Sequence, residues 1–206
     1  MARALGRALP RSFYRRDSRE VAPLLLNKVL VHDHPTDGRV AGRLVEVEAY
    51  AGADDPGSHG FRGETARTAT MFGEPGHLYV YFTYGMHWCV NVVTGDAGVC
   101  SAVLLRAAAP VAGVDTMRAR RLKSRRDRDL CSGPAKLTQA FALRGGHDGI
   151  DLLRGSVRLV DDGTPPPVRP GNTARVGLAT GKGDRERWRW YVVGDENVSR
   201  ARPGGG

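Results

Sequence analysis

The segment 77–93 reads HLYVYFTYGMHWCVNVV and carries five of the fourteen aromatic residues in the chain. Aromatic and β-branched residues favour β-strands. Tyr84-Gly85, near its middle, suits a tight turn because glycine adopts a positive φ at little steric cost. The pattern therefore predicts a β-hairpin with arms Leu78–Thr83 and 86–93. Tyr84 would then be either a structural tyrosine packed at the turn or an exposed aromatic tip.

The remaining periodicity predicts an α+β fold, because short antiparallel strands occur with a few segregated helices. We expect a single domain with a curved antiparallel sheet, a protruding β-hairpin and a few flanking helices. Strands are predicted at 28–32, 39–50, 102–107, 157–160, 174–177 and 187–193. Helices are predicted from an Asp17 or Ser18 cap to Leu26, from Val114 to about Leu130, and from Pro134 onward. Residues 1–16 are expected to form a flexible basic arm, 17–198 the domain and 199–206 a flexible tail.

The composition indicates a soluble, basic protein. The 206 residues carry a formal net charge of +9, and such an excess favours a polyanionic partner, either nucleic acid or an anionic membrane surface. The three cysteines form no CxxC pair, so neither a zinc knuckle nor an iron–sulfur cluster is indicated, and a reducing cytoplasm fits best. No apolar run reaches the roughly 18 residues of a membrane span.

Two carboxylates share one face of the predicted strand 39–50, RVAGRLVEVEAY. Alternation places Glu46, Glu48 and Tyr50 on one face and small apolar residues on the other. Carboxylates two positions apart on a strand lie roughly 7 Å apart, and their repulsion together with burial could raise one pKa. The alternative is a solvated pair of strand carboxylates.

Arg106 interrupts the apolar run of the strand 102–107. A buried guanidinium needs a carboxylate or several carbonyl groups. Pairing with Glu46 or Glu48 would satisfy it and would make the two strands neighbours. His59 lies in a long polar segment, 52–71, and a lone histidine is more often structural or exposed than functional.

Several site types have no motif in this sequence. There is no GxGxxG or Walker A motif for a nucleotide cofactor, no HExxH or HxE…CxxC spacing for zinc hydrolysis or deamination, and no GxSxG nucleophile elbow. We therefore expect neither a metal nor a cofactor. The remaining carboxylates, tyrosines, histidines and arginines suit a water activated by a carboxylate beside an aromatic slot.

The segment 118–128, RARRLKSRRDR, contains seven lysines or arginines. It would be either a solvated helix face or a face that contacts phosphates.

Four blocks of the sequence together resemble a known family. VEVEAYAGADDPGSH (45–59), MFGEPGHLYVYFTYGMHWCVNVV (71–93), AVLLRAAAP (102–110) and LCSGPAKL (130–137) are similar, in order and spacing, to the 3-methyladenine DNA glycosylases of the alkyladenine/methylpurine type. The resemblance covers residues 22–193, and the hairpin block is its most specific part.

This resemblance implies roles for seven residues. Glu48 matches the general base that deprotonates the water attacking C1′, and Arg106 matches the arginine that holds this water and carboxylate. Tyr84 matches the side chain that enters the duplex, and Asn91 matches the asparagine that crowds the exocyclic amino group of guanine. The extruded base would be sandwiched and hydrogen-bonded by Tyr50, His59 and Tyr81.

The expected activity is that of a monofunctional DNA glycosylase acting, as a monomer, on duplex DNA that contains a damaged purine, with no membrane partner. No lysine lies beside Glu48 and Tyr50 in sequence, so a Schiff-base strand cleavage is not indicated. Two alternatives stay open. One is a catalytically idle binder of damaged DNA on the same scaffold. The other is a hydrolase of a sugar or RNA that uses Glu46 and Glu48 as its carboxylate pair.

Overall fold

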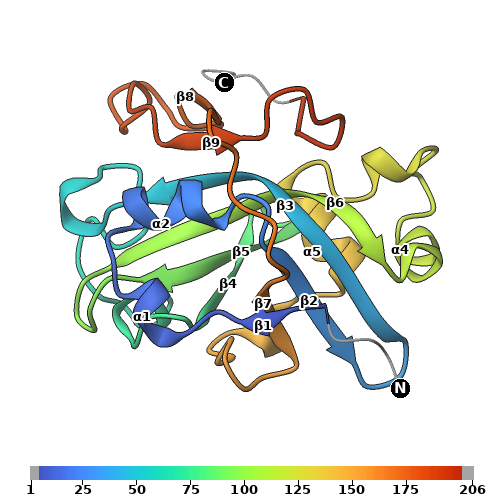
Figure 1. Cartoon of the computed structure of the whole chain (residues 1–206). Coiled ribbons are helices and arrows are strands. Elements are labelled where there is room, and N and C mark those ends of the chain that lie inside the picture. Colours follow the sequence, from blue (N-terminus) through green and yellow to red (C-terminus); the bar gives the residue numbers. More distant parts are fainter. Residues whose placement is uncertain (1–4, 201–206) are drawn as a thin grey trace.

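The computed structural model describes residues 5–200. The strands are β1 (Arg7–Ala8), β2 (Val29–His34), β3 (Gly38–Tyr50), β4 (Leu78–Thr83), β5 (His87–Thr94), β6 (Ser101–Ala112), β7 (Val157–Asp161), β8 (Gly171–Thr173) and β9 (Arg189–Tyr191). The helices are α1 (Arg11–Tyr14), α2 (Ser18–Leu25), α3 (Ala69–Phe72), α4 (Val114–Arg120) and α5 (Pro134–Phe141), with 3₁₀ turns η1 (Gly52–Asp54), η2 (Asp127–Asp129) and η3 (Gly145–His147). The predicted α+β class, with a curved antiparallel sheet and flanking helices, is confirmed (Figure 1).

The sheet is built around β3. Its main path has the order β1-β7-β2-β3-β6-β5-β4, and β9 pairs with β3 beyond the end of β2 and carries β8. The thirteen residues of β3 therefore pair with β2 and then β9 on one edge, and with β6 on the other. A large apolar cluster packs α2 against β3, and α5 against β5 and β6. The segment with β8 and β9 extends the sheet at the edge of β3, above it in the view of Figure 1.

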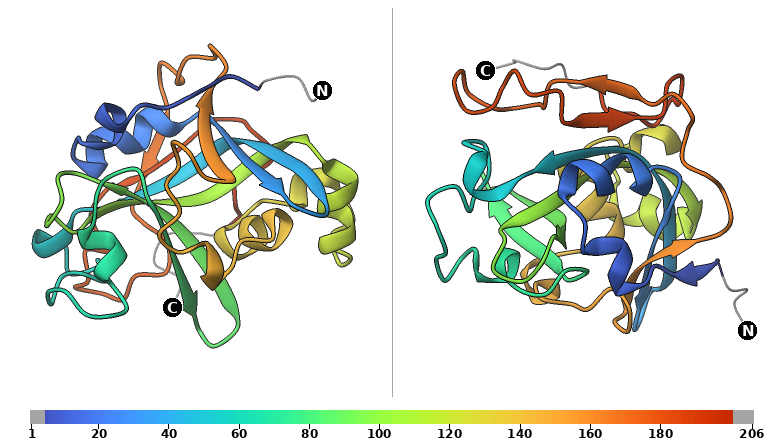
Figure 2. Two further views of the ribbon diagram at one scale, coloured as in Figure 1. Left: turned by 90° about the horizontal axis from the view of Figure 1, so that it is seen from below. Right: turned by 60° about the vertical axis from the view of Figure 1, so that its left-hand side comes forward.

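The predicted hairpin is present. β4 has the expected bounds, whereas β5 begins at His87, one residue later than predicted. A turn of three residues connects β4 to β5, and in it Tyr84 (φ 51°) and Gly85 (φ 63°) both adopt positive φ. The hairpin projects beyond the rest of the sheet (Figure 2, left). Tyr84 is 79% exposed, so of the two possibilities it is the exposed tip.

Three predictions of local structure are wrong. The predicted strand 174–177 is irregular. The predicted helix 114–130 ends at Arg120, where a dense run of like charges disfavours further helix. The predicted arm 1–16 is structured from residue 5 onward, since β1 pairs with β7 and Tyr14 is fully buried. Residues 1–4 of that arm lie outside the described residues.

The predicted flexible tail also needs correction. Ser199 is buried and forms hydrogen bonds inside the domain, while 201–206 lie outside the described residues. Over the described part of the chain, no helix is both long and apolar enough to cross a membrane.

Candidate active site

The carboxylates of Glu46 and Glu48 are both fully buried. Alternation along β3 places them on one face, as predicted. The alternative of a solvated carboxylate pair is wrong, because Arg189 and Ser199 contact Glu46 and the Val176 backbone contacts Glu48. Two buried carboxylates require compensating donors.

Arg106 lies between the two carboxylates. Its Nε donates to Glu46 Oε1 at 2.7 Å, and its Nη1 lies 3.2 Å from Glu48 Oε1. The sequence left open whether Arg106 pairs with Glu46 or with Glu48, and in the structure it pairs with both. As that pairing predicted, β3 and β6 are neighbours. Although burial opposes its charge, the adjacent carboxylates of Glu48 and Glu46 raise the pKa of Arg106 above its usual value.

A β-bulge places Arg106 in this position. Glu46 is paired with Ala107 and Val47 with Leu105, so Arg106 is the extra residue of β6 at this point. A bulge bends the strand and redirects the side chain of its extra residue. The irregularity in the β3–β6 ladder thus coincides with the charged cluster.

Glu46 is saturated with hydrogen bonds. Besides Arg106, its carboxylate accepts from Arg189 Nε at 2.7 Å, from the Ser199 backbone N–H at 2.7 Å and from Ser199 Oγ at 2.9 Å. Burial acts to raise the pKa of Glu46, but Arg106 and Arg189 outweigh it and hold that pKa below its usual value. Glu46 is therefore a fixed, ionised anchor.

Glu48 has a different environment. Its Oε2 accepts from the Tyr50 hydroxyl at 3.0 Å, and its Oε1 accepts from the Val176 backbone N–H at 2.8 Å. Tyr50, Arg106 and Val176 line a cavity of about 260 Å³. Glu48 itself is fully buried, and it contacts these three lining residues directly.

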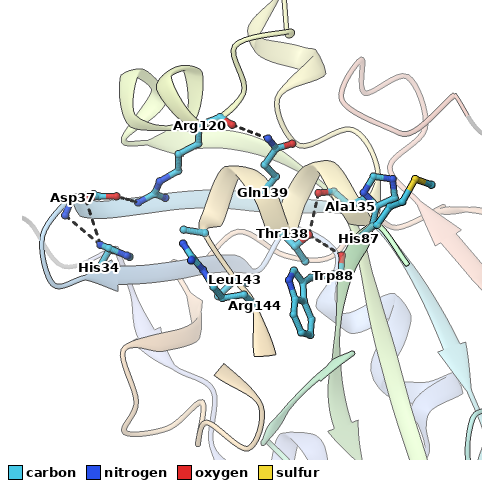
Figure 3. A pocket seen from close by; sticks show the side chains of 12 residues that line it. His34, Asp37, His87, Trp88, Arg120, Ala135, Thr138, Gln139, Leu143 and Arg144 are labelled. Atoms are coloured by element: carbon cyan, nitrogen blue, oxygen red, sulfur yellow. Dashed lines mark hydrogen bonds and ion pairs between the residues drawn. The ribbon is translucent and has the colours of Figure 1, made fainter. Parts of the chain in front are cut away.

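The cavity brings together the other residues singled out from the sequence. Its lining includes Tyr50, His59, Tyr81, Tyr84, Asn91 and Arg106. A larger hollow of about 680 Å³ lies between α5, β5 and the β2–β3 turn (Figure 3). None of the predicted site residues lines it, and its Asp37–Arg120 pair, at 2.7 Å, is mutually neutralised.

The cavity has aromatic walls without charge, apart from Arg106, which also lines it. Tyr79 and Tyr81 stack with ring centroids 5.3 Å apart, and the His59 ring meets Tyr81 edge-on at 4.5 Å. Burial raises the pKa of Tyr81 and Tyr50 well above the usual value. Burial, together with Arg67, lowers the pKa of His59. At neutral pH these walls are therefore suited to a planar ring.

Two further contacts orient these walls. His59 Nδ1 and the Tyr79 hydroxyl share a hydrogen bond at 3.2 Å. Arg67 donates to the Phe82 carbonyl at 3.1 Å, which ties the polar segment 52–71 to the hairpin. Asn91 is buried on β5, and its Oδ1 has no hydrogen-bond partner among the described residues. Asn91 lines the cavity and carries a buried polar atom without a partner among these residues.

Sequence reasoning missed several residues of this site. The sequence pattern could have indicated Arg189, since Arg187 and Arg189 alternate with Trp188 and Trp190 in the strand-like segment RWRWYVV. No such pattern indicates Ser199 or the Val176 backbone N–H, because both lie in irregular segments. Among the described residues, no group of three or more His, Cys, Asp or Glu side chains is placed to hold a metal ion.

Comparisons with known proteins agree on one family. A family model described as "Methylpurine-DNA glycosylase (MPG)" matches residues 12–196. A protein of Burkholderia orbicola named "Putative 3-methyladenine DNA glycosylase" is 53% identical over 200 residues, which cover 96% of this chain and 94% of that protein. Proteins with the same name from Streptomyces avermitilis (46% identity, 93% of this chain, 90% of that protein) and Methanoculleus marisnigri (45%, 93% and 98%) are also similar.

The two carboxylates should respond differently to removal of charge. Glu46→Gln leaves Arg106 and Arg189 undercompensated in the interior, and we expect a loss of about 3–5 kcal/mol in the free energy of unfolding. In Glu48→Gln the amide oxygen can still accept from the Val176 N–H, and the amide NH₂ can donate to the Tyr50 hydroxyl. We therefore expect the free energy of unfolding to fall by less than about 2 kcal/mol. Urea denaturation at pH 7 measures both values, and equal losses would contradict the assignment of Glu46 as the anchor.

The pH dependence provides the control. Because the folded-state pKa of Glu46 is lowered, its stabilisation is complete above the unfolded carboxyl pKa of about 4.3. It is lost as the pH falls through the folded-state value. The difference in stability between the native protein and Glu46→Gln should therefore shrink below about pH 4.

Proposed function

The chain belongs to the methylpurine-DNA glycosylase family, and from this premise we propose that it is a monofunctional glycosylase of duplex DNA that acts as a monomer. It flips alkylated or deaminated purines of the 3-methyladenine, 7-methylguanine, hypoxanthine and 1,N6-ethenoadenine class out of the helix. It then hydrolyses the N-glycosidic bond and so initiates base excision repair. The observation that carries this proposal is the buried Glu48 carboxylate, held by residues that line an aromatic cavity beside an exposed hairpin tip.

Base flipping requires a side chain that fills the vacated space. The glycosidic bond of a stacked base is out of reach, and extrusion costs a few kcal/mol. Tyr84 is 79% exposed, and it lines the mouth of the cavity. An aromatic wedge at this position would offset part of the cost of unstacking.

The cavity suits a flipped purine. Tyr50, His59 and Tyr81 would sandwich and hydrogen-bond the base. Alkylation at N3 or N7 makes the purine cationic, and the faces of tyrosine rings attract a cation by about 1–2 kcal/mol. Asn91 would crowd the exocyclic amino group of guanine, because its amide is buried beside the cavity.

In the proposed hydrolysis, Glu48 takes a proton from the water that attacks C1′ and stabilises positive charge on the deoxyribose. Arg106 and the Val176 backbone N–H hold the carboxylate in position. A cationic purine is a good leaving group and needs no acid, whereas hypoxanthine needs a hydrogen bond or a proton. Within residues 5–200, which the structure describes, no lysine lines the cavity, and this supports a monofunctional enzyme.

The geometry does not favour the alternative of a carboxylate-pair hydrolase. Both Glu46 oxygens accept hydrogen bonds from Arg106, Arg189 or Ser199. The Glu46 carboxylate is therefore not free to act on a substrate.

The basic segment 118–128 divides into paired and unpaired cations. Arg118, Arg126 and Arg128 form ion pairs at 2.6–2.9 Å. Lys123 and Arg125 are exposed and have no ion pair among the described residues. They line a groove with Arg121, Ser124, Arg126, Asp129 and Lys136.

This groove and the cavity both reach the start of α5. Lys136 lines the groove and Pro134 lines the cavity, and both lie in the first turn of α5. We propose that the unpaired cations contact the phosphates that flank the flipped nucleotide. The basic segment would then be a phosphate-binding face rather than a purely solvated one.

Incubation with four duplexes, each carrying one lesion of the proposed class, tests the enzyme itself. We expect release of free base from at least one of them. Glu48→Gln should lower the single-turnover rate by about 10²–10⁴-fold while lesion binding is kept, because the general base is lost. Chromatography of the released base measures this, with Glu20→Gln, an exposed carboxylate on α2, as the control. Base release from no duplex would establish the idle binder instead.

Tyr84→Ala tests the wedge. Because the side chain is exposed, we expect the free energy of unfolding to change by less than about 0.5 kcal/mol. Affinity for a lesion duplex should fall by about 1–3 kcal/mol, the usual contribution of a base–aromatic stack. Fluorescence of a flipped 1,N6-ethenoadenine reports the same step. Tyr84→Phe should keep the wedge, and a collapse of the fold in Tyr84→Ala would place the tyrosine in the core.

The double variant Lys123→Gln/Arg125→Gln tests the phosphate-binding face. We expect the slope of log K against log salt concentration to fall by about 2, one for each lost phosphate contact. Removal of the neutral pair Arg128–Glu196 as Arg128→Gln/Glu196→Gln is the matched control and should leave the slope unchanged. Equal slopes for the two double variants would show that this groove does not face DNA.

A further inference from the structure

A second buried ion pair contacts Tyr50, one of the residues that line the cavity. Arg175 donates to Asp55 through Nη1 at 2.5 Å and Nη2 at 2.6 Å, and both side chains are fully buried. The same guanidinium donates to the Ala49 carbonyl at 3.0 Å and the Gly183 carbonyl at 3.2 Å. Burying an ion pair is a weak route to stability, because desolvation offsets the attraction.

The guanidinium of Arg175 is stacked on the ring of Tyr50. Its central carbon lies 4.6 Å from the Tyr50 ring centroid and 4.9 Å from that of Trp188. Tyr50 lines the cavity, and its hydroxyl donates to Glu48. The plane of the guanidinium therefore fixes the plane of a cavity wall.

The backbone beside Arg175 reaches the other oxygen of the same carboxylate. Val176 follows Arg175 directly, and its N–H donates to Glu48 Oε1 at 2.8 Å. Because Arg175 is held by Asp55, the segment that carries this N–H is held as well. Arg175 thus holds the partners of both Glu48 oxygens: the Tyr50 ring for Oε2 and the Val176 N–H for Oε1.

The surroundings of Arg175 are shaped for its planar group. A Cβ at Gly183, which has φ +70°, would lie 2.4 Å from Arg175 Nη2. A Cβ at Gly57 would lie 3.0 Å from the same atom. Two glycines from separate loops therefore leave room for the guanidinium, and no larger side chain fits at either position without displacing it.

We propose that Arg175 and Asp55 are positioning residues that set the Tyr50 ring and the Glu48 carboxylate in their reactive geometry. They act through these two groups and touch neither the base nor the DNA. This inference rests on the proposed glycosylase function. It predicts that the pair controls the rate of hydrolysis and not the affinity for the lesion.

Arg175→Lys is the informative variant, because lysine keeps the charge next to Asp55 but lacks the planar fork that stacks on Tyr50. We expect the single-turnover rate per active site to fall roughly 10–100-fold, the usual effect of a small misplacement of a catalytic group. The dissociation constant for a duplex with an abasic-site analogue should change less than about threefold. Titration with this analogue gives the active fraction. Arg11→Lys, in the Arg11–Asp151 pair away from the cavity, is the matched control.

A second readout separates positioning from stability. If Arg175 acts through Glu48, then Arg175→Lys combined with Glu48→Gln should be no slower than Glu48→Gln alone. Additive losses, an unchanged rate, or a parallel loss of affinity would overturn the proposal. Asp55→Asn provides an independent variant, and if neither variant folds, the pair is a stability element and the proposal is wrong. Absence of base release by the unmodified protein would instead reject the glycosylase function.

Discussion

The carboxylates of Glu46 and Glu48 can be buried side by side only because Arg106 lies between them. An uncompensated carboxylate in the interior costs several kcal/mol, and two on one strand face also repel each other. Arg106 and Arg189 bring the cluster to two negative and two positive groups. Because a regular β6 would not carry an extra residue at this point, the bulge at Arg106 is the feature on which the cluster depends.

This arrangement makes the C-terminal segment part of the site. β9 pairs with β3 opposite the two glutamates, Ser199 completes the shell of Glu46, and Val176 holds Glu48. The carboxylates come from the first quarter of the chain and most of their cover from the last. The two carboxylates on one strand face therefore differ: Glu46 accepts hydrogen bonds from four donors, whereas Glu48 contacts residues that line the cavity.

Local pattern was sufficient to predict β3, the hairpin, α2 and α5, because each is set by alternation, a glycine turn or a helix start that is visible in a short window. It was also sufficient to group Glu48 with Arg106. What the sequence could not show is which short irregular segments pack on these elements. Ser199 and Arg175 gain their roles from contacts more than 100 residues away. The bulge at Arg106 likewise depends on the partner strand. Residues 5–16 resemble a basic arm in sequence, because they have few apolar side chains. Those few side chains hold the segment on the domain only through burial against distant elements, which a short window does not show.

In the proposed mechanism, binding alone cannot provide selectivity for damaged bases. The charged cluster that contains Arg106 is balanced, and the aromatic walls are uncharged, so preference for a cationic purine rests on cation–π attraction of about 1–2 kcal/mol. This corresponds to roughly 5–30-fold, whereas a genome offers about 10⁶–10⁹ competing sites. A damaged base also unstacks at lower cost, and a cationic purine leaves more readily once Glu48 delivers water. The preferences for a damaged base over a normal base must therefore multiply over flipping, binding and bond cleavage. A cavity that binds damaged purines with only moderate preference is then sufficient, because bond cleavage discriminates between damaged and normal bases once more.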